Sequence, residues 1–110
     1  MTKIETRTVT SADGTQIWAE RTGDFTQPAI VFLPGFGFSS TAFEKQFSDT
    51  KLQENLHLVR YVCRGHARSD QPTRDNAYTS NCMAEDFKAV CEALQITHPV
   101  LAGWYVVHSI

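Results

Sequence analysis

The chain has 110 residues, of which 42% are hydrophobic and 20% are charged, and its formal net charge is -2. This length accommodates one domain, and the composition is typical of a globular chain in water. The charge gives no indication of a nucleic-acid partner, and no stretch approaches the roughly 20 apolar residues of a membrane span. The nearest approach to a basic cluster is Arg60, Arg64 and Arg68, which we expect to be solvated or ion-paired.

The amino terminus and the cysteines both favour a cytoplasmic location. Residues 1–5 lack the apolar run of a secretory signal. Cys63, Cys82 and Cys91 form no CxxC pair, so we expect reduced and partly buried thiols. No histidine or acidic residue stands at ligand spacing from them, so no metal site is expected.

The first elements that the sequence predicts are the two strands of a hairpin. Residues 5–10 alternate weakly, and residues 15–21 alternate with Ile17 and Ala19 on one face. Residues 11–14 between them form a tight turn, in which Gly14 tolerates a positive φ and Asp13 can bond its own backbone. Residues 22–28 are expected to form a polar loop.

The next segments predict a strand and a helix. Residues 29–33 are an uninterrupted apolar run, which is typical of a strand buried on both faces in a parallel sheet. Residues 34–38 end this strand sharply. Ser39, Ser40 or Thr41 can then cap a helix that includes Phe43 and Phe47.

The remaining chain repeats this alternation. We predict a strand at 56–62, a polar loop at 64–76, a helix at 80–94 and a short strand at 99–102. The apolar stripe of that helix consists of Met83, Phe87, Val90, Cys91 and Leu94. A hairpin followed by β-α-β-α-β predicts an α/β fold with a mainly parallel sheet, in which ligands bind beyond the carboxyl ends of the strands.

Two loops at these carboxyl ends resemble loops of the α/β-hydrolase family, of the AB hydrolase-1 type. Residues 31–37 resemble its strand and His-Gly-x-Gly/Pro loop, with Pro34 at the His position. Residues 64–72 resemble its Arg-Gly-His-Gly-x-Ser loop, with Ala67 in place of the second Gly. The resemblance covers about residues 5–104 and is to the family's N-terminal portion. The matching loop positions are Gly35, Gly37, Arg64, Gly65, His66, Ser69, Asp70 and Gly103.

The resemblance also implies where a nucleophile would lie. In the family a catalytic serine occupies the centre of Gly-x-Ser-x-Gly, on a strained turn between strand and helix. If Gly103 is the first glycine, Tyr105 occupies the serine position and Val107 the second glycine position. The long planar arm of Tyr105 cannot replace a serine, and Val107 is β-branched where no side chain fits. We therefore expect no catalytic residue in this chain.

The other catalytic groups follow from the same resemblance. The family order is nucleophile, acid and then His, so the acid and base are expected after Ile110. None of the four histidines is expected to be the base, and His66 is expected to hold its loop by hydrogen bonds. The oxyanion-hole candidates are Phe36 and Val106. The resemblance implies no metal or organic cofactor, and a small-molecule substrate for intact relatives only.

The resemblance stops abruptly after Trp104. Our hypothesis is that residues 105–110 are a non-family tail of translated intron, because Trp-Tyr-Val can be encoded by TGG-TAT-GTN, which contains a common intron donor sequence. A frameshift and a true truncation stay as alternatives. We expect one partial domain over residues 1–110, truncated at the nucleophile elbow. Its last strand would be an exposed edge, so the chain alone would self-associate or aggregate.

The sequence offers three alternatives to an inactive hydrolase portion. A dinucleotide-binding start at Gly35 and Gly37 is disfavoured, because Ser40 stands at the third glycine and no acidic residue ends the next strand. A non-catalytic binding module could keep part of the fold, and its pocket could be lined by Phe36, Phe38, Phe43 and Trp104. The residues could also be one part of a longer active enzyme. The missing nucleophile, Ser or Asp, leaves the chemistry of intact relatives open.

Overall fold

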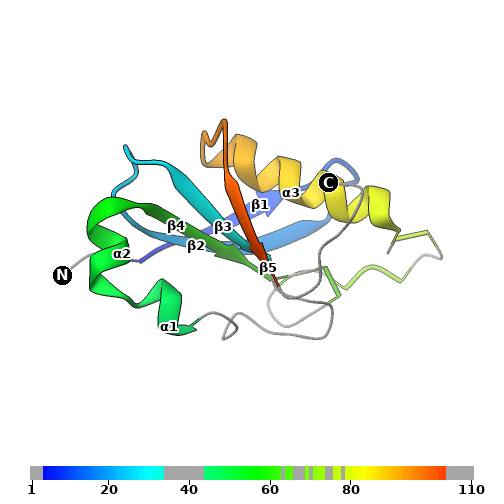
Figure 1. Cartoon of the computed structure of the whole chain (residues 1–110). Helices are drawn as coiled ribbons and strands as arrows, with labels where there is room; N and C mark the ends of the chain where they lie inside the picture. The colour runs from blue at the N-terminus through cyan, green and yellow to red at the C-terminus, as the bar shows by residue number, and fades with distance from the viewer. Residues whose placement is uncertain are drawn as a thin grey trace.

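The centre of the molecule is a five-stranded sheet with the order β1-β2-β4-β3-β5 (Figure 1). This computed structural model describes residues 4–33, 44–62, 64–65, 69, 71–73, 76–77 and 79–103. β1 (Glu5–Thr10) and β2 (Gln16–Gly23) form the predicted antiparallel hairpin. β3 (Ala29–Leu33) lies parallel to both β4 (His57–Tyr61) and β5 (Val100–Gly103), whereas β2 and β4 pair in antiparallel orientation. The predicted α/β fold class is confirmed.

Helices lie on both faces of this sheet (Figure 1). α1 (Glu44–Phe47) and α2 (Thr50–Asn55) cover one face, and α3 (Ser80–Ala93) covers the other. The Asp49 carboxylate accepts hydrogen bonds from the first backbone N–H groups of α2, which is why a new helix begins there. The sequence predicted one helix through Phe47 and did not anticipate α2. Thr79 caps α3 in the same way, close to its predicted start.

Alternation along the central strands divides the apolar core into two layers. Val31 and Val59 face α3, together with Ile17 and Ala19 from the hairpin. The neighbouring residues Phe32 and Leu58 point to the opposite face, where they meet Phe47 of α1. Each of the buried Val, Ile, Leu and Phe side chains stabilises the fold by about 1.5–3 kcal/mol relative to exposure to water. The expectation that residues 29–33 are buried on both faces is confirmed at Val31 and Phe32.

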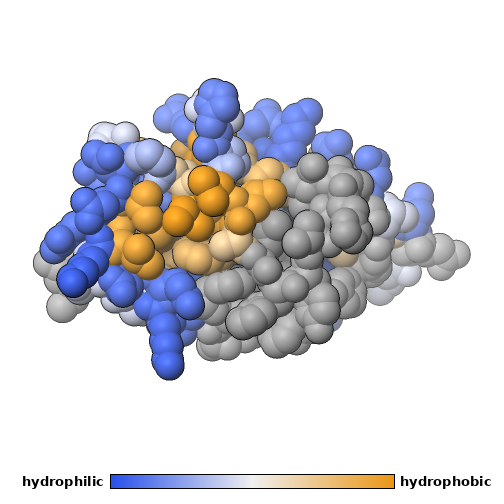
Figure 2. All heavy atoms as spheres, viewed as in Figure 1, coloured by the Kyte–Doolittle hydropathy of each residue, from blue (hydrophilic) through white to orange (hydrophobic). Residues whose placement is uncertain are grey.

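β5 lies at the edge of the sheet, as expected. Among the described strands it pairs with β3 alone, and Val100 and Leu101 are 58% and 42% exposed. Figure 2 shows a continuous apolar area next to this edge strand, between α2 and β5. The partly buried apolar side chains packed on this face are Ile30, Leu52, Leu56 and Ala102. No helix in the described part of the chain is long and apolar enough to cross a membrane.

Close backbone approach fixes the end of β2. Gly23 has a φ of +93°, and a Cβ built on it would lie 2.2 Å from the carbonyl oxygen of Leu56. The residue must therefore be glycine for two reasons, its backbone conformation and the space around it. Gly14, in the hairpin turn, has a similar φ of +89°, but a Cβ there would meet nothing within 4 Å.

His57 is the first residue of β4 and is only 3% exposed. Its ring lies 4.8 Å from the ring of Phe25, centroid to centroid. The Cζ atom of Arg21 lies 3.8 Å from the centroid of the same Phe25 ring. Arg21 is in turn ion-paired with Glu5. Burial, together with the positive charge of Arg21, lowers the pKa of His57 to about 4, and Glu5 opposes this shift.

We predict that Gly23→Ala destabilises the protein by more than about 2 kcal/mol, because the new methyl group meets a backbone carbonyl that cannot yield cheaply. The matched control is Gly14→Ala, which has a comparable φ and open space, and should cost only about 1 kcal/mol. Urea unfolding of the two variants measures the difference. Equal losses would mean that the contact with Leu56 is not a constraint.

We also predict that the protein becomes less stable as the pH is lowered, because His57 must take up a proton on unfolding. The unfolded side chain titrates near pH 6.5 and the folded one near pH 4, so the folded state binds fewer protons between these values. The free energy of unfolding should therefore decrease as the pH falls through this window, by at most about 1.4 kcal/mol per pH unit. His57→Gln should flatten the profile, whereas His98→Gln, at an exposed position, should not. Identical slopes in all three proteins would refute the assignment.

Candidate functional site

The carboxyl ends of the parallel strands are where the sequence places a ligand site. Leu33 and Gly103, the last residues of β3 and β5, are paired in register at this edge of the sheet. Of the predicted site positions, the structure describes Arg64, Gly65, Ser69 and Gly103. The others lie outside the described residues: Gly35, Phe36, Gly37, His66, Asp70, Tyr105 and Val106.

The segment after β4 is held by Arg64, whose side chain is fully buried. Its Nε and Nη2 groups donate to the two carboxylate oxygens of Asp86 on α3, at 2.7 and 2.6 Å. Nη1 and Nη2 donate to Asp13 in the hairpin turn, at 2.8 and 3.2 Å. The second proton of Nη1 goes to the carbonyl oxygen of Ala77, at 2.7 Å. All five N–H groups of the guanidinium are thus satisfied, which only arginine can achieve in this fork geometry.

The electrostatics of this cluster stabilise the charged form of Arg64. Its hydrogen bonds to Asp86 raise the pKa of the guanidinium above its ordinary value, and Asp13 adds to this effect, whereas burial opposes it. A fully buried cation is tolerated here because it has two carboxylate partners and no unused donor. The cluster joins three segments that are far apart in the sequence: the hairpin turn, the loop after β4 and α3.

Ser69 fastens the same loop at a second point. Its hydroxyl donates to the carbonyl oxygen of Val62 at 2.7 Å and accepts from the backbone N–H of Trp18 at 2.9 Å. Gly65 has a φ of +82°, in the left-handed region that the turn directly after Arg64 requires. The motif positions that the structure describes in this loop therefore have conformational roles. The predicted loop-holding role of His66 stays a prediction.

A second buried arginine ties α1 to the sheet. Arg60 on β4 donates from Nε to Glu20 on β2 at 2.5 Å and from Nη1 to Glu44 on α1 at 2.7 Å. Its guanidinium also lies 4.1 Å from the ring centroid of Phe47. The expectation that the arginines are solvated or ion-paired is confirmed for Arg60 and Arg64, and Arg68 lies outside the described residues.

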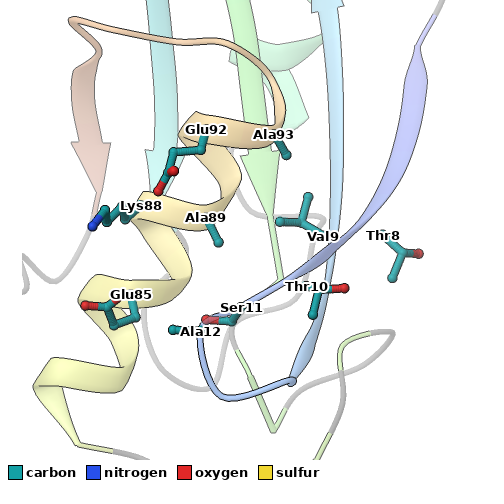
Figure 3. Close-up of a pocket in the computed structure, with 10 residues that line it drawn as sticks. All are labelled: Thr8, Val9, Thr10, Ser11, Ala12, Glu85, Lys88, Ala89, Glu92 and Ala93. Carbon is teal, nitrogen blue, oxygen red and sulfur yellow. The ribbon is translucent and has the colours of Figure 1, made fainter.

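A groove of about 600 Å³ runs between β1 and α3 (Figure 3). Figure 3 shows Ala89 and Ala93 facing Val9 across the gap, while Lys88 and Glu85 extend from α3 away from β1. None of its described lining residues belongs to the loops after β3, β4 or β5. The groove is therefore separate from the predicted ligand site. Within the described ranges, no three His, Cys, Asp or Glu side chains are grouped to hold a metal ion.

Similarity in sequence and structure to known proteins identifies the family. The chain is 34% identical over 99 residues to "Probable oxidoreductase EphD" of Mycobacterium tuberculosis, a match that covers 90% of this chain and 16% of that protein. It is 32% identical over 75 residues to the AB hydrolase superfamily protein YisY of Bacillus subtilis, covering 68% of this chain and 27% of the relative. The crystal structure of a candidate aryl esterase from Burkholderia cenocepacia superposes with a TM-score of 0.85 and 34% identity, over 91% of this chain and 37% of that one. No family model matches the chain.

The chain belongs to the α/β-hydrolase family. It corresponds to the N-terminal portion of the family fold and spans between 16% and 37% of the length of these relatives. The α/β-hydrolase resemblance noted in the two loops is thereby confirmed at the level of family and fold. The described loop after β4 further explains the Arg-Gly-His-x-x-Ser pattern, because Arg64, Gly65 and Ser69 each fix its backbone.

Sequence reasoning missed the partners of Arg64. The sequence pattern predicts a turn role for Asp13 and identifies no partner for Asp86. A signal was present, because Asp86 directly precedes Phe87 on the apolar stripe of α3, and a carboxylate at the border of a buried stripe requires a cationic partner. Identifying Arg64 as that partner needs the fold, since 22 residues separate the two.

We predict that Arg64→Lys lowers the free energy of unfolding by about 2–4 kcal/mol, because a lysine cannot make five directed hydrogen bonds and leaves buried carboxylate oxygens unsatisfied. Arg7→Lys is the control, since Arg7 is exposed on β1 and should change stability by less than about 0.5 kcal/mol. Chemical denaturation followed by far-UV circular dichroism compares the two. A loss at Arg64 no larger than that at Arg7 would contradict the proposed role of the cluster.

Proposed function

We propose that this chain carries the scaffold of an α/β-hydrolase but no hydrolytic activity of its own. The observation that supports the proposal is the end of β5, where Gly103 pairs with Leu33. By resemblance to the family motif, this glycine begins the nucleophile elbow, and two residues later the sequence has Tyr105 where the serine belongs. Val107 stands where the second glycine belongs.

For the full-length relatives we propose only a general reaction class. In the family such proteins cleave ester, amide or related bonds of small molecules, with a nucleophile, a His base and an orienting acid. The candidate aryl esterase from Burkholderia cenocepacia, 34% identical to this chain, fits an acyl-bond substrate. Both the substrate and the nucleophile would be determined by segments outside the part shared with this chain.

We predict that the 110-residue chain neither hydrolyses p-nitrophenyl acetate nor becomes labelled by a fluorophosphonate probe. The physical reason is that a phenol on a long planar arm cannot occupy the strained position of a serine hydroxyl at the elbow. Tyr105→Phe is the matched control, since it removes only the hydroxyl. Hydrolysis by the wild type above the rate of this variant, or a labelled peptide containing Tyr105 or Ser109, would overturn the proposal.

A second proposal concerns self-association of the chain, and the edge strand β5 is the observation that favours it. Val100 and Leu101 are exposed there, next to the apolar face formed around Phe32 and Leu58. An open edge with apolar side chains can pair with the same edge of another copy. We propose that the chain, expressed alone, self-associates through β5.

For this second proposal, Leu101→Lys should shift the chain from larger assemblies toward the monomer, because a charge on an edge strand opposes strand pairing. Ile4→Lys is the control, since Ile4 is 51% exposed but lies outside β5. Sedimentation velocity measures the size distribution. A wild-type chain that is already a monodisperse monomer, or equal effects of both lysines, would rule out association through β5.

A further inference from the structure

A cavity of about 380 Å³ opens at the amino ends of the parallel strands, opposite the end where the hydrolase site is expected. Its walls are the loop at 25–28, the first residues of β3 and β4, and the loop at 95–98 between α3 and β5. The volume lies within the range of about 300–1,000 Å³ that is typical of small-molecule sites. Nothing in the proposed hydrolase chemistry uses this cavity.

His57 is one of the polar residues that line this cavity. The residue is almost completely buried, and its Nε2 atom has no hydrogen-bond partner. Leaving a buried polar atom unsatisfied is unfavourable, so a ligand that supplies the missing partner gains affinity. The Phe25 ring, which lies against the imidazole, is itself 43% exposed and belongs to a loop, so its side chain can turn aside to admit a ligand.

The charges around the cavity favour an anion over a cation. Its described lining includes His57 and His98 but no Asp or Glu. Arg21 of β2 lies over the Phe25 ring and contributes a positive potential at the imidazole, which Glu5 of β1 offsets in part. A cation would meet this positive potential without a carboxylate in the cavity wall. The apolar walls, formed by Phe25, Pro28 and Ile96, accommodate a hydrocarbon body.

We propose that this cavity binds a small carboxylate, whose charged oxygen bonds to Nε2 of His57 and whose apolar body packs against Phe25 and Ile96. The carboxylate supplies the negative partner that the imidazole lacks, so the bound form of His57 takes up one proton from the solvent and becomes imidazolium. Apart from the N–H bond that this proton forms, no covalent bond forms or breaks. The proposal does not depend on the hydrolase function, because the cavity and the strand carboxyl ends lie at opposite ends of the sheet.

The test is a titration of the protein with benzoate. Binding is detected by saturation-transfer difference NMR, a method that also works on a self-associated protein. Affinity of the wild type should rise as the pH is lowered from about 8 to about 6, because binding takes up a proton. His57→Phe keeps a ring against Phe25 but removes both nitrogen atoms, and should weaken binding by about tenfold or more. Ser11→Ala is the matched control, since the Ser11 hydroxyl is also buried and unpartnered but lines the groove between β1 and α3.

His57→Gln distinguishes the effect of proton uptake on benzoate affinity from the effect of the hydrogen bond. It also tests the proposal if His57→Phe fails to fold. It keeps a polar end group but cannot titrate, so its affinity for benzoate should be independent of pH. The proposal is overturned if folded wild-type protein shows no saturable binding at millimolar benzoate. It is also overturned if binding is the same in His57→Phe as in Ser11→Ala, or if His57→Gln keeps the pH dependence of the wild type.

Discussion

The buried guanidinium of Arg64 is the contact on which the described fold most depends. It lies at the carboxyl end of the central strand β4 and uses all its donors on Asp86, Asp13 and the carbonyl oxygen of Ala77. Three segments that share no other described ion pair are thereby held together: the hairpin turn, the loop after β4 and α3. Because a buried cation without partners is very costly, these segments must assemble together.

The residues that hold the fold together are different from those that would carry out the chemistry. The specific loop motif of the α/β-hydrolase family is accounted for, at Arg64, Gly65 and Ser69, by hydrogen bonds and backbone conformation. Catalysis would need a nucleophile at the position that the family resemblance assigns to Tyr105. A chain can therefore keep the family fold over these residues without hydrolytic activity, as we propose for this one, since the residues that maintain the fold are not those that would react.

Much of the fold could be predicted because its signals are local. The apolar run of β3 and the alternation of the hairpin strands each identify an element from adjacent residues. α2 could not, because its six residues carry no apolar period and its start depends on the Asp49 cap. The partners of Arg64 lie 22 and 51 residues away in the sequence, and a pair between distant charges leaves no local pattern. The family resemblance located the loop but not the role of its residues.

The central claim is that one guanidinium couples the hairpin turn to α3, and a double-mutant cycle tests it most directly. Asp13→Asn and Asp86→Asn each remove one carboxylate from Arg64, and the free energy of unfolding would be measured for both variants and for the double variant. Because the two carboxylates share a single partner, we predict a coupling energy greater than about 0.5 kcal/mol. Losses that add within about 0.3 kcal/mol would show that the two contacts act independently, and would contradict the claim.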